Sequence, residues 1–216
     1  MSNYEKVRTR MIQEQLLPRG ITDPAVLKAI EQTPRHLFIQ GALHAQAYGD
    51  FPLPIGHGQT ISQPYVVALM TQLLELKGHE KILEIGTGCG YQSAILSALC
   101  DKVYTVERIK PLLAKTRRIF DRLHKFNIVS KIDDGTEGWP EHAPFDAIIV
   151  TAAGPQVPQP LIDQLADPGI MVLPVGETSD DQTLTMVRKK DGEVTITPIE
   201  NVRFVKLVGT HGWTPQ

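Results

Sequence analysis

The stretch that decides the fold of this chain is Lys81-Ile82-Leu83-Glu84-Ile85-Gly86-Thr87-Gly88-Cys89-Gly90-Tyr91. It begins as a short apolar strand, breaks into three glycines at alternate positions, and continues into a predicted helix over residues 91–99. A strand, a glycine-rich turn and a helix form the first unit of a nucleotide-binding α/β sheet. Glycine suits such a turn because the backbone bends tightly and passes close to a ligand, where a Cβ atom would clash. The sequence therefore predicts a parallel α/β sheet with a ligand site at this turn.

The spacing of the glycines indicates which ligand the turn accepts. The pattern is Glu-x-Gly-x-Gly-x-Gly, whereas dinucleotide sites carry Gly-x-Gly-x-x-Gly and aim a helix N-terminus at a pyrophosphate. Glu84, at the end of the strand, would repel a pyrophosphate but suits a ligand that is cationic or rich in hydroxyls. S-adenosylmethionine is such a ligand, since it has a sulfonium, an ammonium and a ribose. The pattern resembles motif I of the class I S-adenosylmethionine-dependent methyltransferases; taken alone, it also fits a tight turn without a ligand.

The composition is that of an ordinary globular protein. At 216 residues the chain fits a single domain over residues 1–216, long enough to bury a core. The net charge of −2 argues against a nucleic-acid partner. The two cysteines, Cys89 and Cys100, make no disulfide framework, and the sequence shows neither an apolar signal region nor a run of membrane-spanning length. We expect a soluble cytoplasmic monomer that binds neither membrane nor nucleic acid, with no metal site.

Before the glycine motif, the sequence predicts a helical extension and a long loop. Apolar residues recur at helical spacing over residues 3–17, and Thr22-Asp23-Pro24 starts a second helix with a capping side chain and a proline in its first turn. These helices form an N-terminal extension over residues 1–47. Residues 48–63 are rich in proline, glycine and polar groups, and a loop of this length is often functional. A helix over residues 64–76 follows the loop.

From residue 81 the sequence alternates between apolar strands and amphipathic helices. Further strands and helices are predicted at residues 102–107, 111–126 (with Phe126 on the apolar face), 128–133, 145–150, 159–165 and 170–175. Asp191-Gly192 lies between two alternating runs and indicates a hairpin, and residues 201–208 favour one more strand. The predicted fold is a doubly wound, Rossmann-like α/β core over residues 64–216, with a mostly parallel seven-stranded sheet and C-terminal antiparallel strands. The order of the last strands stays open.

Acidic and small residues follow the predicted parallel strands. Ligands of doubly wound sheets bind beyond the carboxyl ends of the strands. Glu107 ends the second strand 21 positions beyond Gly86, close to the spacing of about 20 at which an acidic residue reaches ribose hydroxyls in nucleotide folds. Asp134-Gly135 follows the third strand, and Thr151-Ala152-Ala153 follows the fourth. Each acidic residue alone also fits a solvated strand end, but their joint placement favours an adenosyl cofactor.

The loop before the first helix of the core carries a second motif. Its run Gly56-His57-Gly58-Gln59-Thr60-Ile61-Ser62-Gln63-Pro64 closely resembles the signature of the protein-L-isoaspartate O-methyltransferase family. The resemblance covers nearly the whole chain and includes the glycine motif, Val106-Glu107-Arg108, residues 144–148 and Leu173-Pro174-Val175-Gly176. Three positions depart from the family pattern. Asp133 and Pro168 stand where the family favours glycine, and Lys206 stands where it favours proline. Asp133 lies in the loop that binds adenine in the family. Lys206 lies near the C-terminal end, which helps bind the substrate peptide in the family, so a different peptide preference is expected there.

The resemblance implies a reaction and a set of site residues. The reaction is SN2 transfer of the sulfonium methyl group of S-adenosylmethionine to the α-carboxylate of an isoaspartyl residue in a damaged protein or peptide, which starts a repair cycle. Ser62 is then the expected catalytic residue, as a hydrogen-bond donor that orients the acceptor carboxylate. A serine at the start of a helix also fits an N-cap. The expected cofactor-binding residues are Gln59, Thr60, Ile61, Ser62, Glu84, Gly86, Thr87, Gly88, Gly90, Glu107, Asp134 and Gly135.

Three other functions stay open on the sequence alone. The first is a class I methyltransferase with a different acceptor, such as another protein, a small molecule or RNA; the net charge and the specific loop argue against RNA. The second is an NAD-dependent dehydrogenase, against which Glu84 and the glycine spacing argue. The third is a binding module that keeps the fold without activity, although the intact glycine turn and residues 59–62 make an active enzyme the better interpretation.

Overall fold

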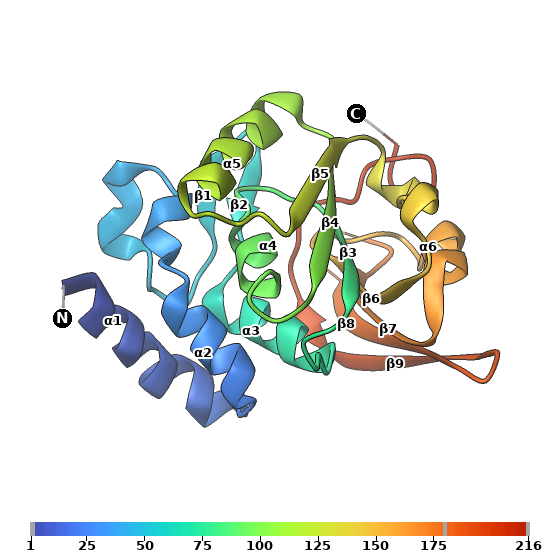
Figure 1. Ribbon diagram of the computed structural model, residues 1–216, viewed down its shortest axis with the longest axis horizontal. Coiled ribbons are helices and arrows are strands. Elements are labelled where there is room, and N and C mark those ends of the chain that lie inside the picture. Colours follow the sequence, from blue (N-terminus) through green and yellow to red (C-terminus); the bar gives the residue numbers. More distant parts are fainter. Residues whose placement is uncertain (1–2, 179–180, 215–216) are drawn as a thin grey trace.

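The computed structural model of this chain describes residues 3–178 and 181–214, so residues 1–2, 179–180 and 215–216 of the predicted domain lie outside the described ranges. Within these ranges the strands of the main sheet are β3 Lys81–Ile85, β4 Lys102–Glu107, β5 Ile128–Ile132, β6 Phe145–Val150, β7 Leu165–Val175, β8 Gln182–Lys190 and β9 Glu193–Val202. Their spatial order is β5-β4-β3-β6-β7-β8-β9 (Figure 1). The strands from β5 to β7 are parallel, and β8 and β9 are antiparallel, joined at Asp191 and Gly192 as predicted. The predicted fold is confirmed, and the order of the last strands is β7-β8-β9.

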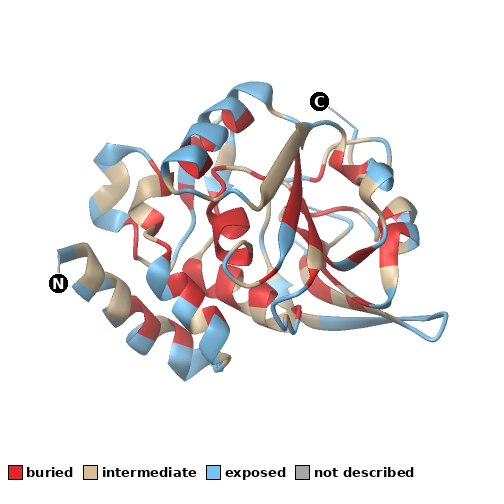
Figure 2. Cartoon of the chain, viewed as in Figure 1, coloured by how far each residue is buried: buried red, intermediate tan, exposed pale blue. Residues whose placement is uncertain are grey.

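Helices cover both faces of the sheet. They are α1 Asn3–Met11, α2 Pro24–Gln32, α3 Pro64–Leu73, α4 Tyr91–Leu96, α5 Lys110–Arg122 and α6 Gln159–Gln164. Because side chains alternate along a strand, successive residues enter opposite cores. Ile82 packs with Met70 of α3 and Leu96 of α4, whereas its neighbour Leu83 packs with Leu161 of α6. The central strands are therefore buried along nearly their whole length (red in Figure 2), as a parallel sheet with two covered faces requires.

The N-terminal extension packs outside α3 and α4 (dark blue to light blue in Figure 1). A π-helical turn, Ile12–Leu16, and a 3-10 turn, Leu17–Arg19, continue directly from α1. The side chain of Asp23 caps α2, because it accepts hydrogen bonds from the backbone N–H groups of Ala25 and Val26 at 2.8 and 3.2 Å. Two 3-10 helices, Arg35–Phe38 and Gly41–Gln46, then lead to residue 48. A helix that could cross a membrane is not found among the described residues.

Residues 48–63 differ from the predicted loop. They contain an antiparallel hairpin formed by β1, Leu53–Gly56, and β2, Gln59–Ile61. The turn between these strands has positive φ angles at Gly56, His57 and Gly58. Short strands that contain proline and glycine carry little local strand signal, which is why the sequence predicted a loop here. The hairpin holds residues 59–61 in a defined position beside the sheet.

Several predicted ends of elements were wrong. Helix α3 ends at Leu73 and not at residue 76, α4 ends at Leu96 and not at residue 99, and β7 begins at Leu165 and not at residue 170.

Two further differences change where a segment lies. β9 ends at Val202, and residues 203–208 leave the sheet to run beside Ala153. The N–H of Ala153 donates to the carbonyl of Val205, and the carbonyl of Ala153 accepts from the N–H of Leu207, both at 2.8 Å. Helix α5 ends at Arg122, so Phe126 is 79% exposed and lies on no apolar helix face. The helix cannot continue because His124 has a left-handed backbone, with φ of 53°.

Candidate functional site

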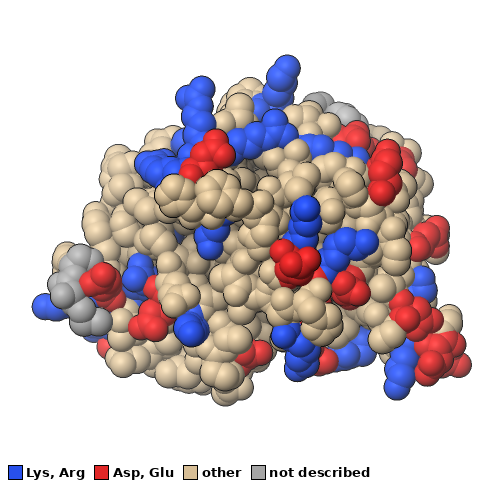
Figure 3. All heavy atoms as spheres, in the orientation of Figure 1, with Lys and Arg blue, Asp and Glu red and all other residues tan. Residues whose placement is uncertain are grey.

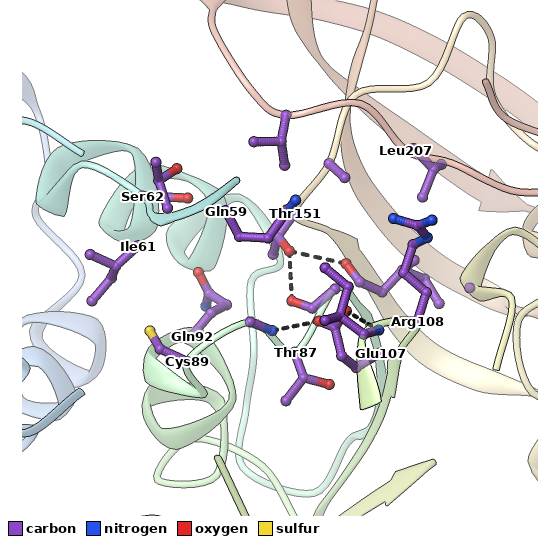
Figure 4. Close-up of a pocket in the computed structure, with 18 of the residues that line it drawn as sticks. Gln59, Ile61, Ser62, Thr87, Cys89, Gln92, Glu107, Arg108, Thr151 and Leu207 are labelled. Atoms are coloured by element: carbon purple, nitrogen blue, oxygen red, sulfur yellow. Dashed lines mark hydrogen bonds between the residues drawn. The ribbon is translucent and has the colours of Figure 1, made fainter. Parts of the chain in front are cut away.

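A cavity opens beyond the carboxyl ends of β3, β4 and β6 (Figure 4). The hairpin, the strand ends and the C-terminal segment line it with residues 59–62, 85–89, 106–109, 151–152 and 205–208, joined by Val67, Met70, Tyr91, Gln92 and Gly135. Nine of the twelve predicted cofactor residues lie in this lining: Gln59, Thr60, Ile61, Ser62, Gly86, Thr87, Gly88, Glu107 and Gly135. The other three, Glu84, Gly90 and Asp134, do not line it. The cavity is where ligands of doubly wound sheets bind.

The glycine turn after β3 has a backbone that other residues cannot easily adopt. Gly86, Gly88 and Gly90 have φ angles of 94°, 54° and 86°. A Cβ atom on Gly86 would also collide with the hydroxyl of Thr151, and one on Gly90 would collide with the side chains of Phe120 and Thr116. Gly90 therefore serves the turn through close packing behind it, while Gly86 and Gly88 present bare backbone to the cavity.

Glu107 lies at the end of β4 with its carboxylate held by the backbone. Its Oε2 accepts a hydrogen bond from the N–H of Gly88, and its Oε1 accepts one from the N–H of Ile109, both at 2.9 Å (Figure 4). The residue is only 6% exposed. Because a carboxylate has about four acceptor positions, two remain for donors that enter the cavity. Glu107 is thus a preset acceptor for a pair of neighbouring hydroxyls.

Glu84 lies beneath the cavity rather than in its wall. Its Oε2 accepts hydrogen bonds from the hydroxyls of Thr105, at 2.6 Å, and of Ser93, while its Oε1 has no hydrogen-bond partner among the described residues. The residue is completely buried, and this burial raises the pKa of its carboxyl group to about 7. The hydroxyl of Thr105 is in turn 2.7 Å from that of Thr87, which lines the cavity. Hydrogen bonds through the hydroxyls of Thr105 and Thr87 therefore link Glu84 to the wall of the cavity.

Asp134 stays a predicted cofactor residue, and its carboxylate already has partners within the protein. Its Oδ1 accepts hydrogen bonds from the N–H and the hydroxyl of Thr136 at 2.8 and 2.7 Å, and its Oδ2 accepts one from the N–H of Thr210 at 2.7 Å. The carboxylate is thereby turned onto its own loop and the C-terminal segment. Its neighbour Gly135 lines the cavity, so the loop reaches the site through its backbone.

Ser62 lies where two cavities meet. The N-cap of α3 is Gln63, without a capping side-chain hydrogen bond, so the structure does not support an N-cap role for Ser62. Beyond Ser62 lies a groove of about 800 Å³, lined on one side by residues 200–205. The groove and the first cavity share four lining residues, which are Thr60, Ser62, Thr151 and Val205. Ser62 is thus part of the wall of both the cavity and the groove.

Several lining residues were not predicted. Arg108 and Ile109 directly follow Glu107, so their position at a strand end was a usable signal. Cys89 is buried in the glycine turn, and burial raises the pKa of its thiol to about 11, which leaves it unreactive. Residues 205–208 come from the other end of the chain, and no local pattern points to the cavity.

Comparison with known proteins gives a consistent result. The family model described as protein-L-isoaspartate(D-aspartate) O-methyltransferase matches residues 6–212. A protein-L-isoaspartate O-methyltransferase of Pelobacter propionicus is 56% identical over 214 residues, which cover 98% of this chain and 100% of that relative. One from Geobacter metallireducens is 54% identical over 211 residues, covering 98% of both chains.

Solved structures agree with these sequence relatives. A protein-L-isoaspartate O-methyltransferase structure superposes with a TM-score of 0.85 at 28% identity, over 97% of this chain and 67% of that one. A second, from Plasmodium falciparum, described as a putative protein-L-isoaspartate O-methyltransferase in complex with S-adenosyl-L-homocysteine, has a TM-score of 0.80 at 26% identity, over 96% of this chain and 99% of that one. The likeness thus includes the N-terminal extension as well as the sheet.

Proposed function

Because this chain belongs to the protein-L-isoaspartate(D-aspartate) O-methyltransferase family, we propose that it transfers the methyl group of S-adenosylmethionine to the α-carboxylate of L-isoaspartyl residues in damaged proteins and peptides. The observation that carries the proposal is the position of Ser62 in the walls of both the cavity and the groove. A methyl transferase needs a donor space and an acceptor space that touch. The cavity suits the donor, and the groove suits a peptide.

The residues of the cavity fit S-adenosylmethionine. The free acceptor positions of Glu107 suit the two hydroxyls of its ribose. The bare backbone of Gly86 and Gly88 allows close approach of the methionine part, and Thr87, whose hydroxyl is linked through Thr105 to the buried Glu84, lines the same turn. Gly135 and Leu207 also line the cavity and offer apolar contact to the adenine base. When bound, the cofactor supplies an electrophilic methyl group.

The protein's contribution to the reaction is positioning. The acceptor α-carboxylate is already ionised at pH 7, since ordinary carboxyl pKa values are about 3.3–4.3, so no general base is needed. Ser62 donates a hydrogen bond to this carboxylate and turns one oxygen toward the methyl group. Holding reactants in line can supply about 7–11 kcal/mol of the barrier. Ser62 itself has no histidine or acidic partner in the described part of the chain, so a nucleophilic role has no support.

The product chemistry follows from the ester. The carbonyl carbon of a methyl ester is more electrophilic than that of a carboxylate, and methoxide is a better leaving group than oxide. The backbone nitrogen of the next residue therefore attacks this carbon, and a succinimide forms as the C–OCH3 bond breaks and methanol is lost. Hydrolysis of the succinimide returns part of the material to normal aspartate. The enzyme therefore starts a repair cycle that water completes.

The test uses two synthetic peptides that differ in one linkage, isoaspartyl or normal aspartyl. Each is incubated with the protein and methyl-labelled S-adenosylmethionine, and base-labile methyl ester is counted. We expect label on the isoaspartyl peptide only. Label on neither peptide, with cofactor binding intact by calorimetry, would point to a methyltransferase with a different acceptor.

We further propose that the chain works as a single-domain cytoplasmic monomer without a nucleic-acid partner. Support comes from its length and from its balanced charge, since basic and acidic side chains both occur on the face drawn in Figure 3. Light scattering behind a sizing column tests the oligomeric state. A dimer mass at micromolar concentration would contradict it.

A further inference from the structure

Arg19 forms part of the wall of the groove beside Ser62. It comes from the N-terminal extension, at the end of the 3-10 turn after α1. Its NH1 donates to Oδ2 of Asp50 at 2.7 Å, and its guanidinium carbon lies 3.2 Å from the centre of the Tyr65 ring. The side chain is nonetheless 42% exposed. Two contacts thus hold a partly exposed guanidinium at the groove, which lowers the entropy lost when it binds a ligand.

The same oxygen of Asp50 also binds the segment that carries Ser62. Oδ2 accepts a second hydrogen bond from Nε2 of Gln63, also at 2.7 Å, and Gln63 directly follows Ser62. The other oxygen, Oδ1, is buried without a hydrogen-bond partner among the described residues. One carboxylate therefore joins Arg19 of the N-terminal extension to the segment that carries Ser62.

The charge at this wall is positive. Arg35 is fully buried and does not line the groove, but its positive charge acts electrostatically on Asp50. On another part of the groove, the carboxylate of Glu200 accepts a hydrogen bond of 3.1 Å from the hydroxyl of Tyr65, and Arg203 adds a further positive charge. The charged residues that line the groove are Arg19, Arg203 and Glu200, which together carry one net positive charge.

Building on the proposed function, we propose that Arg19 is a specificity-determining residue that favours isoaspartyl substrates with a carboxylate side chain beside the isoaspartyl residue. A guanidinium has five N–H donors in a fixed fork, and Asp50 engages only its NH1 group. The remaining N–H groups donate hydrogen bonds to a carboxylate of a peptide in the groove, which is the second carboxylate that Arg19 binds. Asp50 is the positioning residue, because it fixes Arg19 and Gln63 together.

The experiment measures kcat/KM for three isoaspartyl peptides that are identical except for a Glu, Gln or Lys beside the isoaspartyl residue. We expect the natural protein to prefer the Glu peptide over the Lys peptide by about fivefold, the size of one solvent-exposed ion pair. The preference should shrink as salt is raised from 0.05 to about 0.5 M, because salt screens exposed charges. Arg19→Gln should bring the ratio of kcat/KM for the Glu peptide to that for the Lys peptide close to one. Arg19→Lys should keep part of the preference for the Glu peptide.

Two further variants sharpen the result. Arg188→Gln is the matched control, because Arg188 is 41% exposed, pairs with Glu75 and does not line the groove, so the ratio should stay at its natural value. Glu200→Gln should raise the ratio, because it removes the negative charge from the groove.

Asp50→Asn separates positioning from a purely structural role. It should raise KM for all three peptides several-fold while the cofactor Kd stays within about twofold; a purely structural role would lower the melting temperature and leave KM unchanged.

The outcomes separate the two proposals. Methylation of all three peptides with a flat ratio, or the same ratio in Arg19→Gln as in the natural protein, overturns the role of Arg19 and leaves the proposed function standing. Methylation of none of them overturns both.

Discussion

Glu107 accepts a hydrogen bond of 2.9 Å from the backbone N–H of Gly88, so the end of β4 is joined to the glycine turn after β3. Its second oxygen accepts another of 2.9 Å from the N–H of Ile109. Both donors are backbone groups, so the carboxylate does not depend on a neighbouring side chain for its position. An acceptor that is fixed before the ligand arrives loses little entropy on binding.

We expect Glu107→Ala to weaken binding of S-adenosylmethionine about 10- to 100-fold, because hydrogen bonds to a charged group are worth about 1.5–3 kcal/mol. Isothermal calorimetry measures the Kd directly. Glu141→Ala is the control, since Glu141 is exposed and does not line the cavity. Equal affinity of Glu107→Ala and the natural protein would remove Glu107 from the cofactor site.

Ser62→Ala should lower kcat for an isoaspartyl peptide by about 10- to 100-fold, since it removes one hydrogen bond to a charged acceptor. Cofactor Kd should stay within about twofold. Steady-state kinetics with saturating cofactor gives the first value, and a thermal melt shows whether folding is intact. Normal turnover with a lower melting temperature would mean that Ser62 is structural after all.

Gly86→Ala should destabilise the protein and abolish cofactor binding. Its φ is 94°, and the added Cβ would meet the hydroxyl of Thr151. Gly20→Ala is the matched control, because Gly20 has a similar φ of 84° but nothing within 4 Å of the added atom. Urea unfolding should show about 1 kcal/mol lost at Gly20 and clearly more at Gly86. Equal losses of unfolding free energy in the two variants would show that the close approach to Thr151 does not contribute to the destabilisation.

The buried carboxyl of Glu84 predicts a pH dependence of stability. Burial raises its pKa from an ordinary 4.5 to about 7 in the folded protein. Between these values the folded state holds a proton that the unfolded state releases, so the free energy of unfolding falls as pH rises through this window. The loss for this group is about 3 kcal/mol at most.

Glu84→Gln tests this dependence, because the amide is neutral at every pH. Urea unfolding at pH 5 and at pH 8 should show a smaller difference in the variant than in the natural protein. Parallel pH profiles for the two proteins would show that Glu84 does not titrate in this range.

The parts of the fold that sequence could predict are those with local causes. β4 and β6 have the predicted bounds, because residues 102–107 and 145–150 are rich in β-branched and apolar side chains and belong to strands that are covered on both faces. The glycine turn was predictable for a similar reason, since three glycines at alternate positions have few other uses. Asp23 capped α2 as expected because the capping contact spans only a few residues.

What sequence could not predict depends on distant partners. Asp134 follows β5 as the family pattern requires, but Thr136 and Thr210 occupy its carboxylate, and Thr210 is 76 positions away. The segment 205–208 is strand-like in sequence, yet it pairs with Ala153 instead of joining the sheet. The hairpin of β1 and β2 has too few residues for an apolar alternation to appear.

The lining of the cavity runs from Gln59 to Val208, so the site joins segments that are about 150 positions apart. The last strand of the sheet ends at Val202, whereas the wall made by residues 205–208 lies beyond it. A protease that cuts between Val202 and Val205 would therefore leave all seven strands of the sheet in one piece and remove one wall of the cavity. Loss of methyl-donor binding would then be an early sign of damage to this end of the chain.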